Sequence, residues 1–114
     1  KNKCENSKRK LISKLNKYKK NNLSVAGYAA TSKSTTILNY CNINTKYLDY
    51  ICDTTKEKIG KYSPGMHIPI VSMKHFKQNP PDKAFLFAWN HKNEIFKKEK
   101  NFTKKKRWFA HINI

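Results

Sequence analysis

The sequence predicts an α/β domain in which a small, mostly parallel sheet lies between two layers of helices. Short apolar runs alternate with helical patterns along the 114 residues, at a spacing typical of βαβ units. The run at 83–89, KAFLFAW, is almost wholly apolar, as expected for a strand buried on both faces. A third observation is the apolar run at 23–30, which leads into lysine and hydroxyl residues before a helical pattern. Together these features predict a single Rossmann-like three-layer sandwich, preceded by an amphipathic helix.

The first half of the chain supplies two predicted helices and two predicted strands. Apolar residues recur at helical spacing over 7–20, and Asn21 and Asn22 end that amphipathic helix. The apolar run gives a strand over 23–29, and a second helical pattern gives a helix over about 35–42. A strand over 47–52 then ends at Asp53. A start at Lys1 without methionine suggests that residues 1–22 come from an upstream domain and that 23–114 form the folded domain.

The second half is predicted to begin with a loop over 53–66. Residues 67–70 form a short extended segment, since a residue before proline avoids the helical region. Ser72 is positioned to cap a short helix over 73–77, and 79–82 is a turn. The remaining elements are a strand over 83–89, a helix over 92–102 and a strand over 108–114. Glu94 and Glu99 are expected to form weak surface pairs with the lysines of that helix.

The net charge of +18 raises the question of a nucleic-acid partner. The excess lies at 1–22, with nine basic residues and one acidic, and at 92–107, with eight and two. It consists of 23 lysines against 2 arginines, whereas phosphate and base recognition favours arginine. Nucleic acid is therefore an unfavoured partner, and solvated lysine faces and attraction to an anionic partner both stay open.

No run of about 18 apolar residues and no signal-peptide pattern occurs, so we expect a cytoplasmic protein without a membrane partner. Cys4, Cys41 and Cys52 lack metal-ligand spacing and are interpreted as thiols, two of them buried. The sequence predicts no metal site. It also contains no convincing catalytic acid–base pair and no nucleophile with its partners.

The turn after the first strand is the first candidate binding segment. An α/β sheet binds anions where a strand leads into the start of a helix. Gly27 would allow close approach of the backbone or an unusual φ. Lys33 would supply a positive charge, and hydroxyl donors follow on Ser32, Ser34, Thr35 and Thr36. The alternative is an ordinary capped helix with a solvated lysine. The turn is not the G-x-G-x-x-G of dinucleotide-binding proteins.

Three further segments should meet this turn at the carboxyl ends of the strands. Asp53 would accept a hydrogen bond from a ribose hydroxyl, or else cap the next turn. Pro64, Gly65 and His67 come from the long loop, where His67 either contacts a ligand or fixes the loop. Trp89, Asn90 and His91 follow the apolar strand; Trp89 would stack on a base or pack in the core, and His91 is the better pocket candidate.

Four stretches carry a resemblance to a known family: GYAATSKSTTILNYC, LDYICD, KIGKYSPGMHIPIVS and FLFAWNHKNEI. They resemble the C-terminal domain of the S-adenosylmethionine-dependent sugar C-methyltransferases. In that family the stretches run roughly GYGAPAKGNTLLNYC, a hydrophobic strand ending in D, GxxxPGTHIPI and LLLAWNFADEI. The resemblance covers 23–114. Ala29 and Ser34 replace family glycines, and proline is replaced at Thr31 or Ser32, which leaves the backbone less room beside a phosphate.

The resemblance implies a domain that anchors a nucleotide-linked sugar, with Tyr28 among its binding residues. S-adenosylmethionine and the catalytic groups would belong to an upstream domain in the same chain, so this fragment alone is not expected to catalyse. Two other functions stay open. One is a small basic module that binds nucleic acid, and the other is a protein-interaction domain whose lysine faces dock an acidic partner.

Overall fold

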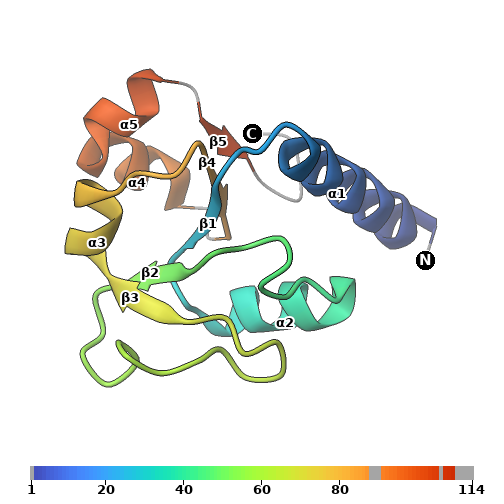
Figure 1. The fold of residues 1–114 in the computed structure, drawn as a ribbon, viewed down its shortest axis with the longest axis horizontal. Coiled ribbons are helices and arrows are strands. Elements are labelled where there is room, and N and C mark those ends of the chain that lie inside the picture. The colour runs from blue at the N-terminus through green and yellow to red at the C-terminus, as the bar shows by residue number, and fades with distance from the viewer. Residues whose placement is uncertain (1, 88–90, 106, 110–114) are drawn as a thin grey trace.

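The computed structural model describes residues 2–87, 91–105 and 107–109, and the side chains of these residues apart from 2–5, 32 and 33. Its centre is a five-stranded sheet of order β3-β2-β1-β4-β5, in which neighbouring strands are parallel (Figure 1). The strands are β1 (Val25–Tyr28), β2 (Ile51–Asp53), β3 (Ile70–Ser72), β4 (Lys83–Leu86) and β5 (Trp108–Phe109). The helices are α1 (Asn2–Lys20), α2 (Ser32–Cys41), α3 (Met73–Gln78), α4 (Lys92–Lys98) and α5 (Lys100–Lys104). The predicted α/β fold is confirmed.

Helices cover both faces of the sheet. Helices α1 and α2 lie on one side of it, and α3, α4 and α5 lie on the other (Figure 1). Successive residues of β1 alternate between the two cores: Val25 belongs to the cluster under α1 and α2, and Ala26 and Tyr28 belong to the opposite cluster. Because both faces are buried, the central strands have the continuous apolar sequences from which a parallel sheet was predicted.

Helix α1 begins earlier than the predicted residue 7 and ends at Lys20 as expected. Its apolar stripe is buried, with Leu11 and Leu15 at 2% and 0% exposure in the core cluster that also contains β-strand residues. Basic side chains next to them in the sequence, such as Lys10 and Lys14, are exposed. This is the pattern of an amphipathic helix packed on a domain. The division of the chain at residue 22 stays a prediction.

Several element boundaries differ from the predicted ones. Helix α2 begins at Ser32 rather than near 35, because Thr31 caps it. Strand β2 is shorter than 47–52, because residues 47 and 48 donate backbone hydrogen bonds to the carbonyl of Asn44 and so form a turn. The predicted helix 92–102 is divided into α4 and α5 at Glu99. Glu99 is also buried, so its expected surface pairing with lysine was wrong.

The segment at 67–70 is only partly extended. Ile70 opens β3, which continues to Ser72, but His67 has a φ of +54°. The preference that precedes proline acts on Ile68 alone, while His67 closes a turn in which its N–H donates to the carbonyl of Ser63. The predicted cap of α3 is confirmed, because the hydroxyl of Ser72 accepts from the His75 N–H at 3.3 Å. Residues 88–90 and 110–114 of the last two predicted strands lie outside the described residues.

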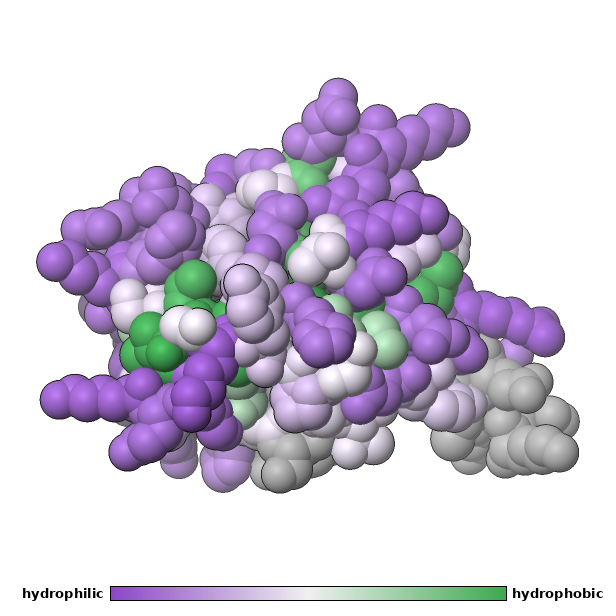
Figure 2. Space-filling view, turned by 60° about the horizontal axis from the view of Figure 1, so that its bottom comes forward, coloured by the Kyte–Doolittle hydropathy of each residue, from purple (hydrophilic) through white to green (hydrophobic). Residues whose placement is uncertain are grey.

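Hydrophilic side chains dominate the face of the molecule in Figure 2, and hydrophobic side chains form small separate areas on it. Two ion pairs occur within the described residues, Lys19–Asp49 and Lys58–Asp53. Most of the lysines therefore leave their charge unbalanced by a nearby carboxylate. In the part of the chain that the structure describes, no helix combines the length and the apolar character needed to cross a membrane. The cytoplasmic location stays a prediction.

Candidate functional site

A cavity of about 290 Å³ lies where the loop after β1, the first turn of α2 and the long loop before β3 meet. The first two segments contribute Ala30, Thr31, Ser34 and Thr35 to its lining, and the long loop with β3 contributes Lys58, Lys61, Tyr62, Ser63, Pro64 and Ile70. Ligands of open α/β sheets bind at this edge, beyond the carboxyl ends of the strands. The sequence prediction that the first turn of the helix and the proline loop come together is confirmed.

A hydrogen bond to β2 fixes the backbone between β1 and α2 at the residue directly before the cavity lining begins. Ala29 has a φ of +76°, a conformation that glycine adopts readily and alanine does not. Its N–H donates to the carbonyl of Cys52 at 2.8 Å, which ties the end of β1 to β2. The thiol of Cys52 lies in the core on the opposite face of the sheet, where burial raises its pKa to about 12.

The first turn of α2 is closed by its own hydroxyl groups. Thr31 Oγ1 accepts from the Ser34 N–H at 3.2 Å, which makes Thr31 the cap of the helix. The hydroxyls of Ser34 and Thr35 donate to the carbonyl of Thr31 at 2.6 and 3.3 Å. These two predicted ligand donors therefore hold the helix start, as the capped-helix alternative expected. Thr36 is exposed, and the side chains of Ser32 and Lys33 are not among those that the structure describes.

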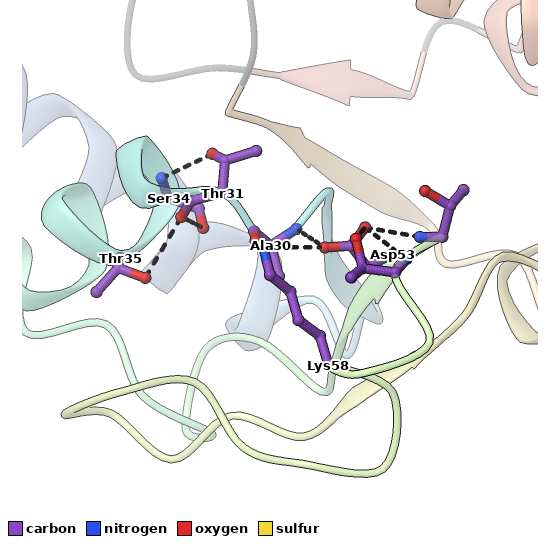
Figure 3. A network of polar contacts seen from close by, with 8 residues as sticks. Ala30, Thr31, Ser34, Thr35, Asp53 and Lys58 are labelled. Carbon is purple, nitrogen blue, oxygen red and sulfur yellow. Dashed lines mark hydrogen bonds and ion pairs between the residues drawn. The ribbon is translucent and has the colours of Figure 1, made fainter.

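Asp53 is the centre of a network of polar contacts beside the cavity (Figure 3). Its Oδ2 accepts from the Ala30 N–H at 3.1 Å, and its Oδ1 accepts from the N–H groups of Thr54 and Thr55 at 2.6 and 3.2 Å. Both oxygens are thus used by the chain itself, which is the geometry of the turn-capping alternative for this carboxylate. Asp53 is 7% exposed and joins β2, the loop after β1 and the long loop.

Lys58 closes this network from the long loop. Its ammonium donates to the carbonyl of Ala30 at 2.6 Å and lies 3.8 Å from Asp53 Oδ2. In Figure 3 the side chain runs from the loop towards Ala30, between the helix start and Asp53. Lys61 and the exposed ring of Tyr62 also line the cavity. Because Asp53 balances the charge of Lys58, the positive potential of the cavity comes from Lys61.

The proline loop is pressed against α2. Gly65 has a φ of +85°, and a Cβ at this position would collide with Oδ1 of Asn39 in α2. Pro64 lines the cavity, whereas His67 is exposed and is not part of the lining. The loop is further closed by the Ile68 N–H, which donates to the hydroxyl of Ser63 at 3.0 Å. The structure thus explains Gly65 by its positive φ and its close approach to α2, and the residue is not part of the cavity lining.

Two other predicted site residues lie away from this cavity. Gly27 is inside β1, with no positive φ, and a Cβ there would lie 2.7 Å from Cε2 of Phe87. The structure thus attributes this glycine to core packing and not to the unusual backbone conformation that the sequence suggested. The side chain of Tyr28 points into the opposite core, where its hydroxyl donates to Glu99 Oε2 at 2.7 Å. Burial, followed by the hydrogen bond to Glu99, raises the pKa of the Tyr28 hydroxyl.

The segment after β4 remains partly untested. Trp89 and Asn90 lie outside the described residues, and His91 is exposed directly before α4. Sequence reasoning missed Thr31 as the cap and missed Lys58, Lys61 and Tyr62 as wall residues. The signal for the last three was their position in a basic loop directly after a strand-ending aspartate. Among the described residues no cluster of potential metal ligands occurs.

Comparison with known proteins identifies related sequences. A family model described as the C-methyltransferase C-terminal domain matches residues 1–112. The C-methyltransferase NovU of Streptomyces niveus is 40% identical over 78 residues, which are 68% of this chain and 19% of NovU. The chain thus spans about a fifth of the length of this curated relative. The family resemblance predicted from the four sequence stretches is confirmed.

Proposed function

Because the chain belongs to the family of C-methyltransferase C-terminal domains, we propose that it anchors a nucleotide-linked deoxysugar for methylation at carbon by an S-adenosylmethionine-dependent enzyme. The observation that carries the proposal is the cavity of about 290 Å³ at the start of α2, where the ammonium of Lys61 and a helix N-terminus line the same space. A diphosphate is the part of such a substrate that this arrangement suits best.

The helix start supplies the first half of the anion site. The ten-residue helix α2 directs its positive end and the N–H groups of its first turn towards the carboxyl edge of the sheet. Thr31 takes the N–H of Ser34, and the N–H groups of residues 32 and 33 precede it in the same turn. A phosphate at this end would accept from these backbone groups while Lys61 balances its charge.

The remaining lining suits a nucleoside. Tyr62 is 63% exposed at the cavity and offers an aromatic face on which a base can stack. Asp53 would not read the ribose, because the chain's own N–H groups and Lys58 engage its oxygens. Recognition of the nucleoside by stacking and phosphate contacts would tolerate more than one base. A strong preference for one base would have to come from residues outside this lining.

The methyl donor does not fit this cavity. S-adenosylmethionine carries a positively charged sulfonium group, and the cavity wall presents the ammonium of Lys61, while Asp53 balances the charge of Lys58. The nearby carboxylate, Asp53, is engaged by the chain itself. The donor would therefore bind elsewhere in the full-length enzyme, in an upstream domain of the same chain. This domain would hold the sugar carbon in place against it, so that the binding energy of the nucleotide serves the transfer step.

An NMR titration tests the proposal. Thymidine, uridine, cytidine and guanosine diphosphates are added to ¹⁵N-labelled protein at about 150 mM salt, with an RNA oligomer in parallel. We expect the diphosphates to shift the amides of 30–36, 53–54 and 58–64. Lys61→Ala should weaken binding by about tenfold, because it removes a charged phosphate contact. Lys74→Ala, at an exposed position of α3, is the matched control and should leave binding unchanged.

Two results would contradict the anchor. One is a failure of every diphosphate to shift these amides at millimolar concentration. The other is equal weakening by Lys61→Ala and Lys74→Ala, which would show a general effect of net charge. RNA shifts spread over α1, α4 and α5 without diphosphate shifts would favour the nucleic-acid alternative.

A further inference from the structure

A second cavity lies on the other face of the sheet, between the end of α3 and the α4–α5 pair, and has a volume of about 440 Å³. Its floor includes the buried rings of Phe76 and Phe102 together with the buried side chain of Glu99. Exposed lysines, including Lys98 and Lys105, surround it. This site shares no lining residue with the cavity at the start of α2.

Glu99 is the unusual feature of this cavity. It is 6% exposed and lies at the junction where α4 ends and α5 begins. The Tyr28 hydroxyl donates a hydrogen bond to Oε2 of Glu99 at 2.7 Å. Among the described residues, the structure gives Oε1 no hydrogen bond and gives the carboxylate no ion pair, although lysines line the same cavity. A carboxylate accepts about four hydrogen bonds, so this buried group retains acceptor capacity beside an open volume.

The lining selects for a molecule that carries two kinds of group. The free acceptor of Glu99 calls for hydroxyl donors, and it repels a simple anion. The lysine rim favours a phosphate or carboxylate over a neutral sugar, because hydrogen bonds between opposite charges are stronger. We propose that this cavity binds a small polyhydroxylated anion, a sugar phosphate or a sugar acid, with its hydroxyls on Glu99 and its anionic group at Lys98 and Lys105. A volume of about 440 Å³ accommodates one such molecule.

The test compares four probes by NMR titration of the whole chain. Glucose 1-phosphate and glucuronate carry both hydroxyls and an anion, while glucose and inorganic phosphate each carry one of the two. We expect the two-function probes to shift the amides of 76–80 and 98–105 and to bind at least about tenfold more tightly than either single-function probe. Tighter binding of the phosphate ester than of glucuronate would identify a sugar phosphate, and the reverse a sugar acid.

Substitutions of Glu99 and Lys105 test which protein group binds the hydroxyls of the ligand and which binds its anionic group. Glu99→Gln retains an acceptor for Tyr28 but loses the charge, and it should weaken glucose 1-phosphate by about tenfold while leaving inorganic phosphate unchanged or tighter. Lys105→Ala should weaken both phosphates, whereas Lys104→Ala, on the same helix but outside the lining, should weaken neither. If Glu99→Gln does not fold, the lysine pair still decides the question.

The proposal is overturned if glucose 1-phosphate binds no more tightly than phosphate, or if both lysine variants behave alike. It is also overturned if the shifts fall on 30–36 and 58–64, since the ligand would then occupy the cavity at the start of α2.

Discussion

Tyr28→Phe should lower the free energy of unfolding by about 2–3 kcal/mol. The substitution removes the hydroxyl that donates to Glu99 at 2.7 Å, and Glu99 is only 6% exposed, so the carboxylate loses a charge-assisted hydrogen bond in a largely buried position. Hydrogen bonds to charged groups contribute about 1.5–3 kcal/mol, and a buried acceptor left without a donor costs at the upper end of that range. Phenylalanine keeps the edge contacts of the ring with Phe76 and Trp108, at centroid distances of 5.4 and 5.2 Å.

Tyr50→Phe is the matched control in the same core. The hydroxyl of Tyr50 donates to the backbone carbonyl of Asn79 at 3.2 Å. That acceptor is neutral and belongs to an exposed residue, so we expect a loss of about 0.5–1.5 kcal/mol. Urea denaturation followed by far-UV circular dichroism measures both variants. Equal m-values would show that the substitutions change stability and not the unfolded state.

A double-mutant cycle decides whether the charge of Glu99 is the cause. In a Glu99→Gln background the loss on Tyr28→Phe should shrink to about 1 kcal/mol, the value for a neutral hydrogen bond. The reasoning is refuted if Tyr28→Phe costs less than about 1 kcal/mol, or no more than Tyr50→Phe. Either result would mean that a lysine ammonium or water satisfies the carboxylate without the tyrosine.

Four further single substitutions test the core, the thiol and two helix caps by urea denaturation. Gly27→Ala should lower the free energy of unfolding by about 1–3 kcal/mol, because its new methyl carbon would lie 2.7 Å from Phe87 Cε2. Adding Phe87→Leu should recover part of this loss, whereas strictly additive losses would contradict the contact. Burial raises the pKa of the Cys52 thiol to about 12, so the folded state keeps this thiol protonated at a pH where the unfolded chain ionises it. The contribution of Cys52 to stability is therefore complete below about pH 8.5, the pKa of an unfolded thiol, and declines as pH rises towards 12. Between pH 8 and 10 the free energy of unfolding should fall by about 2 kcal/mol more in the natural chain than in Cys52→Ala, and equal falls would contradict this prediction. Thr31→Val removes the cap of α2 and Ser72→Ala that of α3, each at about 1 kcal/mol, whereas unchanged stability would show that water replaces the cap.

The sheet was predictable because parallel strands are buried on both faces and leave continuous apolar runs. The run at 83–89 and the strand that begins near Val25 are clear cases. The cap of α3 was predictable as well, since Ser72 stands alone before a short helical pattern. At α2 the sequence offers several neighbouring hydroxyl residues, and each is an acceptable cap. Local pattern therefore could not select Thr31, and the predicted helix began too late.

The candidate site was harder to predict because its walls depend on tertiary contacts. Lys58 and Lys61 lie in a loop without periodicity, and their positions follow from hydrogen bonds to Ala30 and from the turn of the loop onto β3. Glu99 has the sequence surroundings of a surface residue, with lysines on both sides. Its burial follows from the break between α4 and α5, which turns the side chain towards Tyr28. Nothing in the local sequence signals that break.

The substitution of a family glycine by Ala29 is compatible with the site because the surrounding groups fix the backbone. A non-glycine residue at a φ of +76° costs about 1–3 kcal/mol and persists only where its neighbours hold it. Here the carbonyl of Cys52 takes the N–H of Ala29 at 2.8 Å, while Asp53 and Lys58 hold the N–H and carbonyl of Ala30 at 3.1 and 2.6 Å. The same contacts shape the cavity wall, so the wall is set before a ligand arrives. Part of the hydrogen bonding that the sequence suggested for a ligand is therefore used to preorganise the site, and a preorganised site loses less entropy when it binds.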